Sequence, residues 1–265
     1  MVALQHRDGQ KNQKGSIPIW FLWGFSLLGA KGRSYNQRMA QLKAYRTVAP
    51  DGVGQSLFED RKSQFHGFAV HAESAEEAIA FRHSVMERIP SASHYVSAWV
   101  LADGGEFYSD AKEPHGSAGL PVLNVIKGAG VADTACVVAR IFGGTLLGKG
   151  GLMRAYTKAA TDALAAASIV SRVPCQLLDV VVPYPLYEPL SKRAGDWQAT
   201  VDGSDFAENV TMHLSVPVDC AQGLVDGIRE FSDARAVCTL GGQELRFLAQ
   251  DVAGATDAGS GDVDA

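Results

Sequence analysis

A run of glycines between an apolar segment and an amphipathic segment, in residues 135–160, most restricts how this chain can fold. The apolar, largely β-branched residues before it, 136–142, predict a buried strand. From Leu152 to Leu164 apolar residues recur at helical spacing, which predicts a helix. So much glycine between a strand and a helix indicates positive φ angles, or a neighbour too close for a Cβ. The glycines are Gly143, Gly144, Gly148, Gly150 and Gly151.

The same stretch comes close to a phosphate-binding P-loop. Gly143, Gly148 and Lys149 fit the spacing G-x-x-x-x-G-K, but Gly150 follows where Ser or Thr would bind magnesium. The pattern therefore disfavours a P-loop NTPase, whereas free backbone amides at the start of the helix still favour an anion. Arg140 and Arg154 add positive charge on either side. The alternative, that the glycines serve only tight packing of the strand on the helix, stays open.

Composition and charge exclude several classes of protein. A chain of 265 residues with 46% hydrophobic and 20% charged residues is globular, and it has room for one large or two ordinary domains. The net charge of −5 is uneven, since residues 175–248 carry five basic against eleven acidic side chains. An acidic total argues against indiscriminate nucleic-acid binding, although a basic face within 40–174 is allowed. Four cysteines without metal-ligand spacing indicate a reducing compartment, no disulfide framework and no metal site.

Both ends of the chain differ from its middle. Residues 1–38 contain an uncharged run, 17–30, which is too short to span a bilayer and is not followed by a signal-peptide cleavage site. We expect this leader, and the acidic tail 249–265, to be disordered and outside the folded part.

The first half of the folded part predicts alternating strands and helices. Segments 45–48 and 64–71 predict two strands of one hairpin or meander. Ser74 and Glu77 form a capping box that opens a helix ending before Pro90. A strand at 94–101, a polar loop at 109–119 and a short helix from Pro121 follow.

The second half has a different rhythm, which starts at Pro174. It predicts strands at 177–182, 198–206, 210–216 and 234–248, with helices at 187–194 and 219–231. This order, βαββαβ, is that of a ferredoxin-like domain. The change of rhythm and charge predicts a boundary between separable domains near 172–175.

Three segments carry a resemblance to a known family. Residues 61–65 (RKSQF), 109–121 (SDAKEPHGSAGLP) and 137–156 (VVARIFGGTLLGKGGLMRAY) resemble the IMPACT/YigZ family, over about 45–248. The resemblance implies an α+β fold in which residues 40–172 form an N-terminal βαβ domain of the ribosomal-protein/ribonuclease-P type. It also implies a ferredoxin-like domain over 175–248 and a cytoplasmic, translation-linked regulatory role.

The sequence departs from the family pattern in two places. Ala111 and Lys112 stand where the family has Asp-Gly, so that a cation replaces one carboxylate. In the segment matching the family's T-H-N-C-Y, Ser93 and His94 are kept but the cysteine is replaced by Val96. Both changes place in doubt any mechanism that needs a paired carboxylate or that thiol.

Each candidate side chain also has an ordinary structural explanation. Asp110 and Glu113 have the chemistry of an acid–base or metal pair, but in a Pro/Gly loop such residues more often cap a helix or pair with Arg140 or Arg154. His94 is more often a hydrogen-bonded strand residue, and Ser117 more often a cap than a nucleophile. The basic set either follows a phosphate backbone or forms a solvated rim; it comprises Lys62, Arg140, Lys149, Arg154 and Lys158.

We therefore expect a binding protein without a catalytic residue, cofactor or metal. Its expected partner is RNA, the ribosome or a ribosome-associated protein, or another anionic ligand, and not a membrane. The alternatives are a small-molecule enzyme that binds phosphate in the glycine-rich loop, and an interaction module acting through the acidic C-terminal domain. The predicted binding site comprises Lys62, His94, Asp110, Glu113, Ser117, Arg140, Gly143, Gly144, Gly148, Lys149, Gly150, Gly151 and Arg154.

Overall fold

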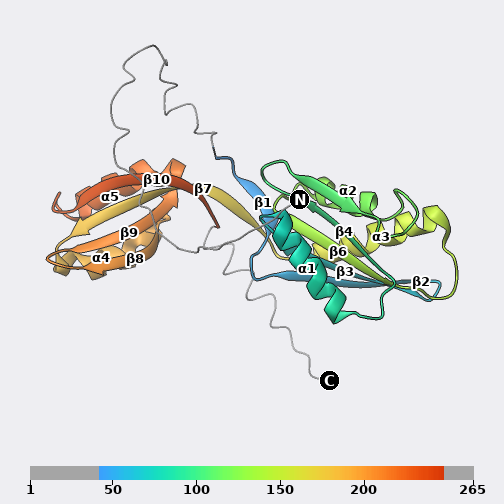
Figure 1. Ribbon diagram of the computed structural model, residues 1–265. Coiled ribbons are helices and arrows are strands. Elements are labelled where there is room, and N and C mark those ends of the chain that lie inside the picture. Colours follow the sequence, from blue (N-terminus) through green and yellow to red (C-terminus); the bar gives the residue numbers. More distant parts are fainter. Residues whose placement is uncertain (1–41, 248–265) are drawn as a thin grey trace, which may run out of the picture. The chain divides into compact units, whose positions relative to one another are not determined.

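The computed structural model describes residues 42–247, which form two five-stranded sheets with helices packed against them (Figure 1). This arrangement confirms the predicted α+β class. The predicted leader 1–38 and the predicted tail 249–265 lie outside the described residues. None of the helices within 42–247 is long and apolar enough to cross a membrane.

The N-terminal sheet has the order β2-β3-β6-β4-β5, and every neighbouring pair is antiparallel. Strands β3 and β4 are joined through α1 and lie on either side of β6, so β6 is inserted into a split βαβ unit. The elements are β2 (Val53–Asp60), β3 (Ser63–His71), α1 (Ala75–Arg88), β4 (His94–Val100), β5 (Glu106–Ser109), α2 (Gly119–Ala129), β6 (Thr134–Ile141) and α3 (Gly148–Ala165).

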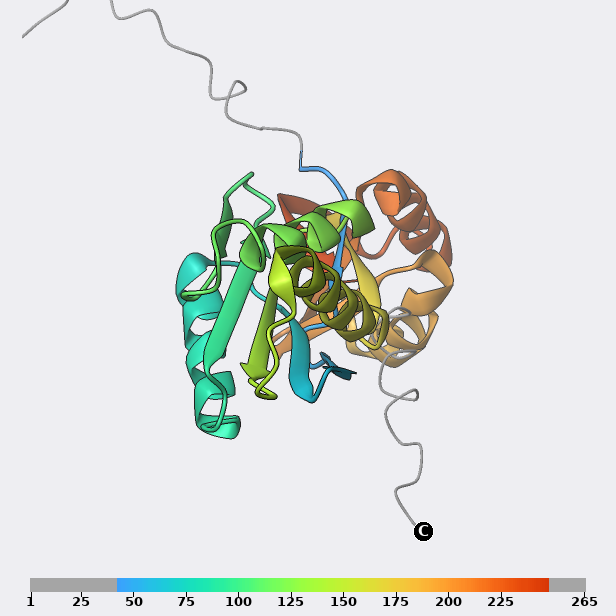
Figure 2. The same ribbon diagram turned by 90° about the vertical axis from the view of Figure 1, so that its right-hand side faces the viewer.

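Strand β6 is covered by helices on both faces, which explains its largely apolar sequence. Cys136 and Val138 belong to the core under α2 and α3, whereas Val137 and Ala139 belong to the cluster on the side of α1. Figure 2 shows α1 on one side of this sheet and the other two helices on the opposite side. Cys136 is fully buried, as expected for a small hydrophobic residue, and its burial raises the pKa of the thiol to about 12.

Two strand glycines let α3 approach the β2–β3 hairpin very closely. A Cβ at Gly67 would lie 2.5 Å from the backbone oxygen of Ala159, and a Cβ at Gly54 would lie 2.0 Å from that of Ala163. The hydroxyl of Ser56 uses the same proximity to donate a hydrogen bond to the Ala159 carbonyl at 2.7 Å. Helix α3 is thus held directly against the hairpin by small residues on both sides.

The expected pairing of segment 45–48 with 64–71 is wrong. Strand β1 (Tyr45–Val48) pairs with β7, and the hairpin partner of β3 is β2, which the sequence analysis did not assign. The hairpin turn is Arg61-Lys62, where both residues have positive φ (46° and 67°). Such type I′ turns usually carry Asn-Gly or Asp-Gly, so two cations gave no turn signal.

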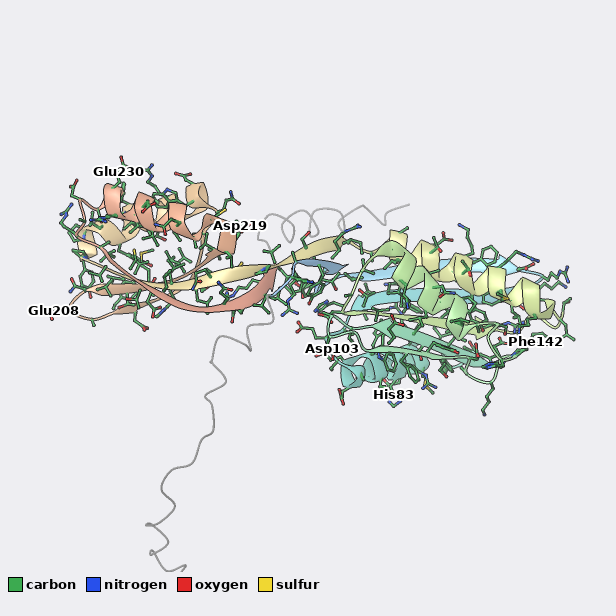
Figure 3. All side chains as sticks on the ribbon, turned by 90° about the horizontal axis from the view of Figure 1, so that it is seen from above. His83, Asp103, Phe142, Glu208, Asp219 and Glu230 are labelled. Atoms are coloured by element: carbon green, nitrogen blue, oxygen red, sulfur yellow. The ribbon has the colours of Figure 1, made fainter. Side chains whose placement is uncertain are left out.

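The C-terminal sheet confirms the predicted ferredoxin-like order. Strand β10 pairs with β7, β7 with β9, and β9 with β8, all antiparallel. Both helices pack on one face of this sheet, around a core centred on Leu178, Met212 and Leu224 (Figure 3). The elements are β7 (Ile169–Val182), α4 (Tyr184–Arg193), η2 (Ala194–Trp197), β8 (Thr200–Phe206), β9 (Val210–Pro217), η3 (Val218–Cys220), α5 (Ala221–Phe231) and β10 (Val237–Phe247).

The boundary predicted at 172–175 falls inside β7, which continues without interruption from 169 to 182. Arg172 forms an ion pair of 2.7 Å with Glu73 and donates to the hydroxyl of Tyr45 at 3.1 Å. Burial and a hydrogen bond to Asp133 raise the pKa of Tyr45 to about 12. The predicted boundary is thus a paired strand and not a linker. That the two parts fold independently stays a prediction.

Gly67→Ala is expected to destabilise the protein by about 1–3 kcal/mol, because α3 must move away from the hairpin to admit the methyl group. Chemical denaturation followed by circular dichroism measures the change.

The matched control is Gly128→Ala, at an exposed position inside α2 where, among the described residues, no heavy atom beyond the adjacent residues and the helix's own backbone lies within 4 Å of the added Cβ. It should raise stability by up to about 1 kcal/mol, because alanine favours a helix. Equal effects of the two substitutions would contradict close packing at Gly67.

Candidate functional site

The glycine-rich stretch joins β6 to α3, but its five glycines do different things. The strand ends at Ile141 and the helix begins at Gly148, so Gly150 and Gly151 belong to the first turn of α3. A Cβ at Gly143 would lie 2.1 Å from the carbonyl carbon of Lys62, so this glycine permits contact with the β2–β3 turn. Gly144 and Gly148 have positive φ. Tight packing thus explains part of the glycine content and not all of it.

The β2–β3 turn supports the glycine-rich loop from one side. The hydroxyl oxygen of Ser63 accepts a hydrogen bond from the amide of Gly143 at 3.1 Å. Arg61 donates to the carbonyl oxygen of Leu146 at 3.4 Å. Lys62 contributes its backbone to this contact, and its side chain is exposed. The position of the loop is therefore fixed by the end of β6, by the start of β3 and by the turn between β2 and β3.

Asp110 organises the loop before α2. Of the two structural roles expected for it, it takes that of a helix cap and does not pair with Arg140 or Arg154. Its carboxylate accepts hydrogen bonds from the amides of Gly116 (2.8 Å), Ala118 (3.1 Å) and Gly119 (2.8 Å). Burial alone would raise the pKa of Asp110, but these amides outweigh it and hold the pKa below its ordinary value. The start of α2 is therefore satisfied internally.

The neighbouring polar residues of this loop have structural roles. Ser117 is fully buried and donates its hydroxyl to the carbonyl of Pro114 at 2.5 Å, so it does not cap α2 as expected. The side chain of His115 is 93% exposed, with Nδ1 3.7 Å from Asp110. Neither residue has the surroundings of a nucleophile or a metal ligand.

Glu113 and Arg140 form a buried ion pair, as expected, at 2.7 Å. The same Glu113 oxygen accepts a hydrogen bond from the hydroxyl of Tyr156 at 2.7 Å. Burial and then the Glu113 charge raise the pKa of Tyr156 far above its ordinary value, so the phenol stays a donor. The contacts join the loop before α2, strand β6 and helix α3.

His94 lies beside this ion pair with a defined tautomer. Its Nδ1 is 2.8 Å from the carbonyl oxygen of Ala111. A carbonyl only accepts hydrogen bonds, so Nδ1 carries the proton and Nε2 of the neutral ring keeps its lone pair. Nε2 is 3.9 Å from Oε1 of Glu113, and His94 lines a cavity.

The cavity has a volume of about 520 Å³ and opens at the start of α3. No described side chain caps this N-terminus, and its first turn contains no acidic residue. Unsatisfied amides and the helix dipole favour an anion at such a position. The cavity is lined by Ser93, His94, Lys112, Glu113, Pro114, Arg140, Phe142, Leu146, Leu147, Gly148, Lys149 and Leu152.

Positive charge gathers at the cavity and is not balanced by acids on its rim. Lys112 and Lys149 are exposed and form no ion pair with any described residue. Arg154 is exposed too, with its guanidinium group 3.7 Å from the position that a Cβ of Gly150 would take. Lys158, which the sequence analysis added to this group, instead forms an ion pair with Asp162 at 2.7 Å.

Three residues of this site do not follow from the sequence pattern. The pattern places Phe142 in the buried strand, but this residue follows the last strand residue and is 45% exposed. Leu146 is 81% exposed, and no motif points to it. Lys112 stands out in the sequence only as a departure from the family pattern. The Gly143-Gly144 pair directly after Phe142 was the available signal that the strand had ended.

The described residues 42–247 contain no group of three or more His, Cys, Asp and Glu side chains arranged to hold a metal ion. Backbone amides and a cation cluster instead give the site the chemistry of anion binding.

Asp110→Asn is expected to destabilise the protein by about 2 kcal/mol at neutral pH, because it weakens charge-assisted hydrogen bonds to three amides. The pKa of Asp110 is lowered by folding, so its contribution is fully present above the ordinary carboxyl pKa. The contribution is lost as the pH falls through the lower folded value. Denaturation of both proteins at a series of pH values should therefore show the difference shrinking in acid.

Asp51→Asn provides the control, since Asp51 is exposed and forms no ion pair with a described residue. A pH-independent difference for Asp110→Asn would mean that the charge of Asp110 is not what holds the loop.

Comparison with known proteins agrees with the sequence resemblance. Residues 61–164, which contain every residue of the site, match the family model of the Impact N-terminal domain. The chain is 32% identical to the IMPACT family member YigZ of Escherichia coli (strain K12) over 163 residues, which is 60% of this chain and 80% of YigZ.

Two further likenesses extend over more of the chain. The IMPACT family member YvyE of Bacillus subtilis (strain 168) is 28% identical over 213 residues, which is 80% of this chain and 96% of YvyE. A crystal structure of a hypothetical protein is similar with a TM-score of 0.50 and 27% identity, covering 78% of this chain and 98% of the other. On the combined evidence of the matched domain and of these relatives, the chain belongs to the IMPACT family.

Proposed function

We propose that this protein binds the phosphate backbone of RNA, in a translation-linked and cytoplasmic role, without catalysing a reaction. The observation that carries the proposal is the uncapped N-terminus of α3, which opens into a cavity flanked by Lys112 and Lys149. In an 18-residue helix the peptide dipoles add up to a partial positive charge at the N-terminus, and the first backbone amides are free to donate to a ligand in the cavity.

The charges around the cavity support an anionic ligand. Glu113 lies in the wall, but its charge is neutralised by Arg140 and its oxygen is occupied by Tyr156. Asp110 is engaged by three amides of its own loop. The net field at the rim is therefore that of the lysines and of the helix dipole, in a chain whose total charge is −5.

A polymer fits this surface better than a small anion does. Arg61 and Lys62 extend the positive charge to the β2–β3 turn, and Arg154 extends it along α3. Cations spaced over a turn, a loop and a helix can contact several phosphates in succession, each of which contributes to affinity. RNA is chosen because of the translation-linked role that the family resemblance implies.

The arrangement offers little support for catalysis. Both carboxylates of the site, Asp110 and Glu113, are held by hydrogen bonds to protein groups. The hydroxyl of Ser117 is buried and donates to a carbonyl. A general base or a nucleophile needs a group free to reach its substrate.

Reversing Lys149 and Arg154 to Glu is expected to weaken binding of a short labelled single-stranded RNA by about 1–3 kcal/mol, with a smaller loss at high salt. Fluorescence anisotropy at two salt concentrations measures it. Thermal stability should be kept or increased, because both residues are exposed and an acidic residue at 149, in the first turn of α3, is favourable.

The control carries the same change of charge on exposed residues of the C-terminal helices, Lys192→Glu with Arg229→Glu. Its binding should be close to that of the wild type. Equal losses in the two double variants would mean that only the net charge matters, and the site on α3 would be rejected.

Lys112→Gly is expected to stabilise the fold and to weaken RNA binding. Ala111 and Lys112 both have positive φ (48° and 70°) in the tight turn from Asp110 to Glu113, and a non-glycine residue there is strained. Relief of this strain should exceed the entropic cost of glycine and raise stability by up to about 1 kcal/mol.

Ala111→Gly is the matched variant, since it relieves the same kind of strain and removes no charge. It should gain stability while its RNA affinity stays at the wild-type value. If Lys112→Gly binds RNA as tightly as Ala111→Gly does, Lys112 has no part in binding.

A further inference from the structure

An exposed aromatic ring stands beside the cations of the cavity. Phe142 follows the last residue of β6, lines the cavity and is 45% exposed. Figure 3 shows it at one end of the N-terminal part of the structure, with Asp103 at the opposite end. The guanidinium group of Arg140 lies over its ring at 5.5 Å from the centroid. Phe142 is therefore supported by a buried side chain while nearly half of it remains open to solvent.

We propose that the cavity receives one unpaired nucleotide of a single strand, whose base stacks on Phe142 while its phosphate lies at the N-terminus of α3. The inference rests on the proposed function, because it assumes that the strand's phosphates bind here. Every nucleobase has a π-face, and stacking on an aromatic side chain is the common way in which proteins hold unpaired bases.

The cavity has the size and the mixed chemistry that a nucleotide needs. Its volume of about 520 Å³ lies in the range of known small-ligand pockets, about 300–1,000 Å³. Apolar side chains, including those of Phe142, Leu146 and Leu147, form one part of the wall. Lys112 and Lys149 belong to the same wall, so a flat apolar group and an anion can bind together.

A buried donor without a partner gives independent support. The side chain of Arg140 is only 5% exposed, and its buried Nε has no hydrogen-bond partner among the described residues. A buried donor left unsatisfied costs about 1–3 kcal/mol. Arg140 lines the cavity, and a ligand oxygen that came within hydrogen-bond distance of Nε would satisfy it.

His94 provides a matching acceptor. Its Nδ1 proton is committed to the carbonyl of Ala111, so Nε2 offers a lone pair at the cavity wall. The amino group of an adenine, cytosine or guanine base can donate to such a lone pair. Arg140 and His94 thus add an unsatisfied donor and a matching acceptor to the residues that line the cavity beside Phe142.

A duplex does not meet these requirements, because its bases are stacked on one another and expose only their edges. The full-length protein should therefore bind a single-stranded adenosine oligonucleotide at least about tenfold more tightly than an RNA duplex or an abasic oligomer of equal length. The abasic oligomer has the phosphates without the bases. Fluorescence anisotropy at fixed salt measures all three affinities.

Phe142→Leu keeps an apolar side chain but removes the aromatic face. It should weaken binding of the adenosine strand about tenfold and leave binding of the abasic oligomer unchanged. Phe107→Leu is the matched control, because Phe107 is similarly exposed (42%) but lies on β5 against Trp99 and does not line the cavity. It should bind both oligomers like the wild type.

The outcomes separate this inference from the proposed function. If Lys149→Glu with Arg154→Glu weakens binding while Phe142→Leu changes nothing, phosphates alone are recognised and the stacking inference is overturned. Equal affinity for the adenosine strand and the abasic oligomer would overturn it as well. Absence of measurable binding to any of the three oligomers would overturn both proposals and favour a protein partner.

Discussion

The ion pair between Glu113 and Arg140 joins the three segments on which the site depends. Glu113 belongs to the loop before α2 and Arg140 to β6, while Tyr156 of α3 donates to the same carboxylate oxygen. Removal of one partner would leave an uncompensated buried charge, at a cost of about 3–5 kcal/mol. Arg140 is further held against the rings of Phe65 and Phe142. The negative charge of the site is thus confined inside, and the cations on the rim remain available.

The elements whose buried faces appear as a pattern of apolar residues could be predicted from the sequence, and the other elements could not. Strand β6 is apolar apart from Thr134 and Arg140 because helices cover both of its faces, and α3 shows its buried face at helical spacing. The β2–β3 hairpin was missed because Arg61 and Lys62 form a turn that normally carries glycine. The place of β1 depends on a strand far along the chain, which no local pattern reveals.

The candidate site was predicted in composition but not in geometry. The cations and the glycines could be read from the sequence. Arg140 was one of the two arginines, with Arg154, that were expected to pair with Glu113. Capping of the following helix was one of the roles expected for Asp110, but its three amide donors could not be named, because they lie six to nine residues ahead in a folded loop. The exposure of Phe142 also escaped prediction, because one residue decides whether an aromatic side chain ends a buried strand or begins a surface loop.

The pairing of β1 with β7 has a consequence for the order of folding during synthesis. Tyr45 and Arg172, which face each other in this pairing, are 127 residues apart. All strands of the N-terminal sheet and its helices are synthesised before the partner of β1. The match to the Impact N-terminal domain ends at residue 164, before β7 begins, so a fragment with those limits contains neither β1 nor its partner. The edge of the N-terminal core next to Val48 is therefore completed late, by a strand that also begins the second sheet.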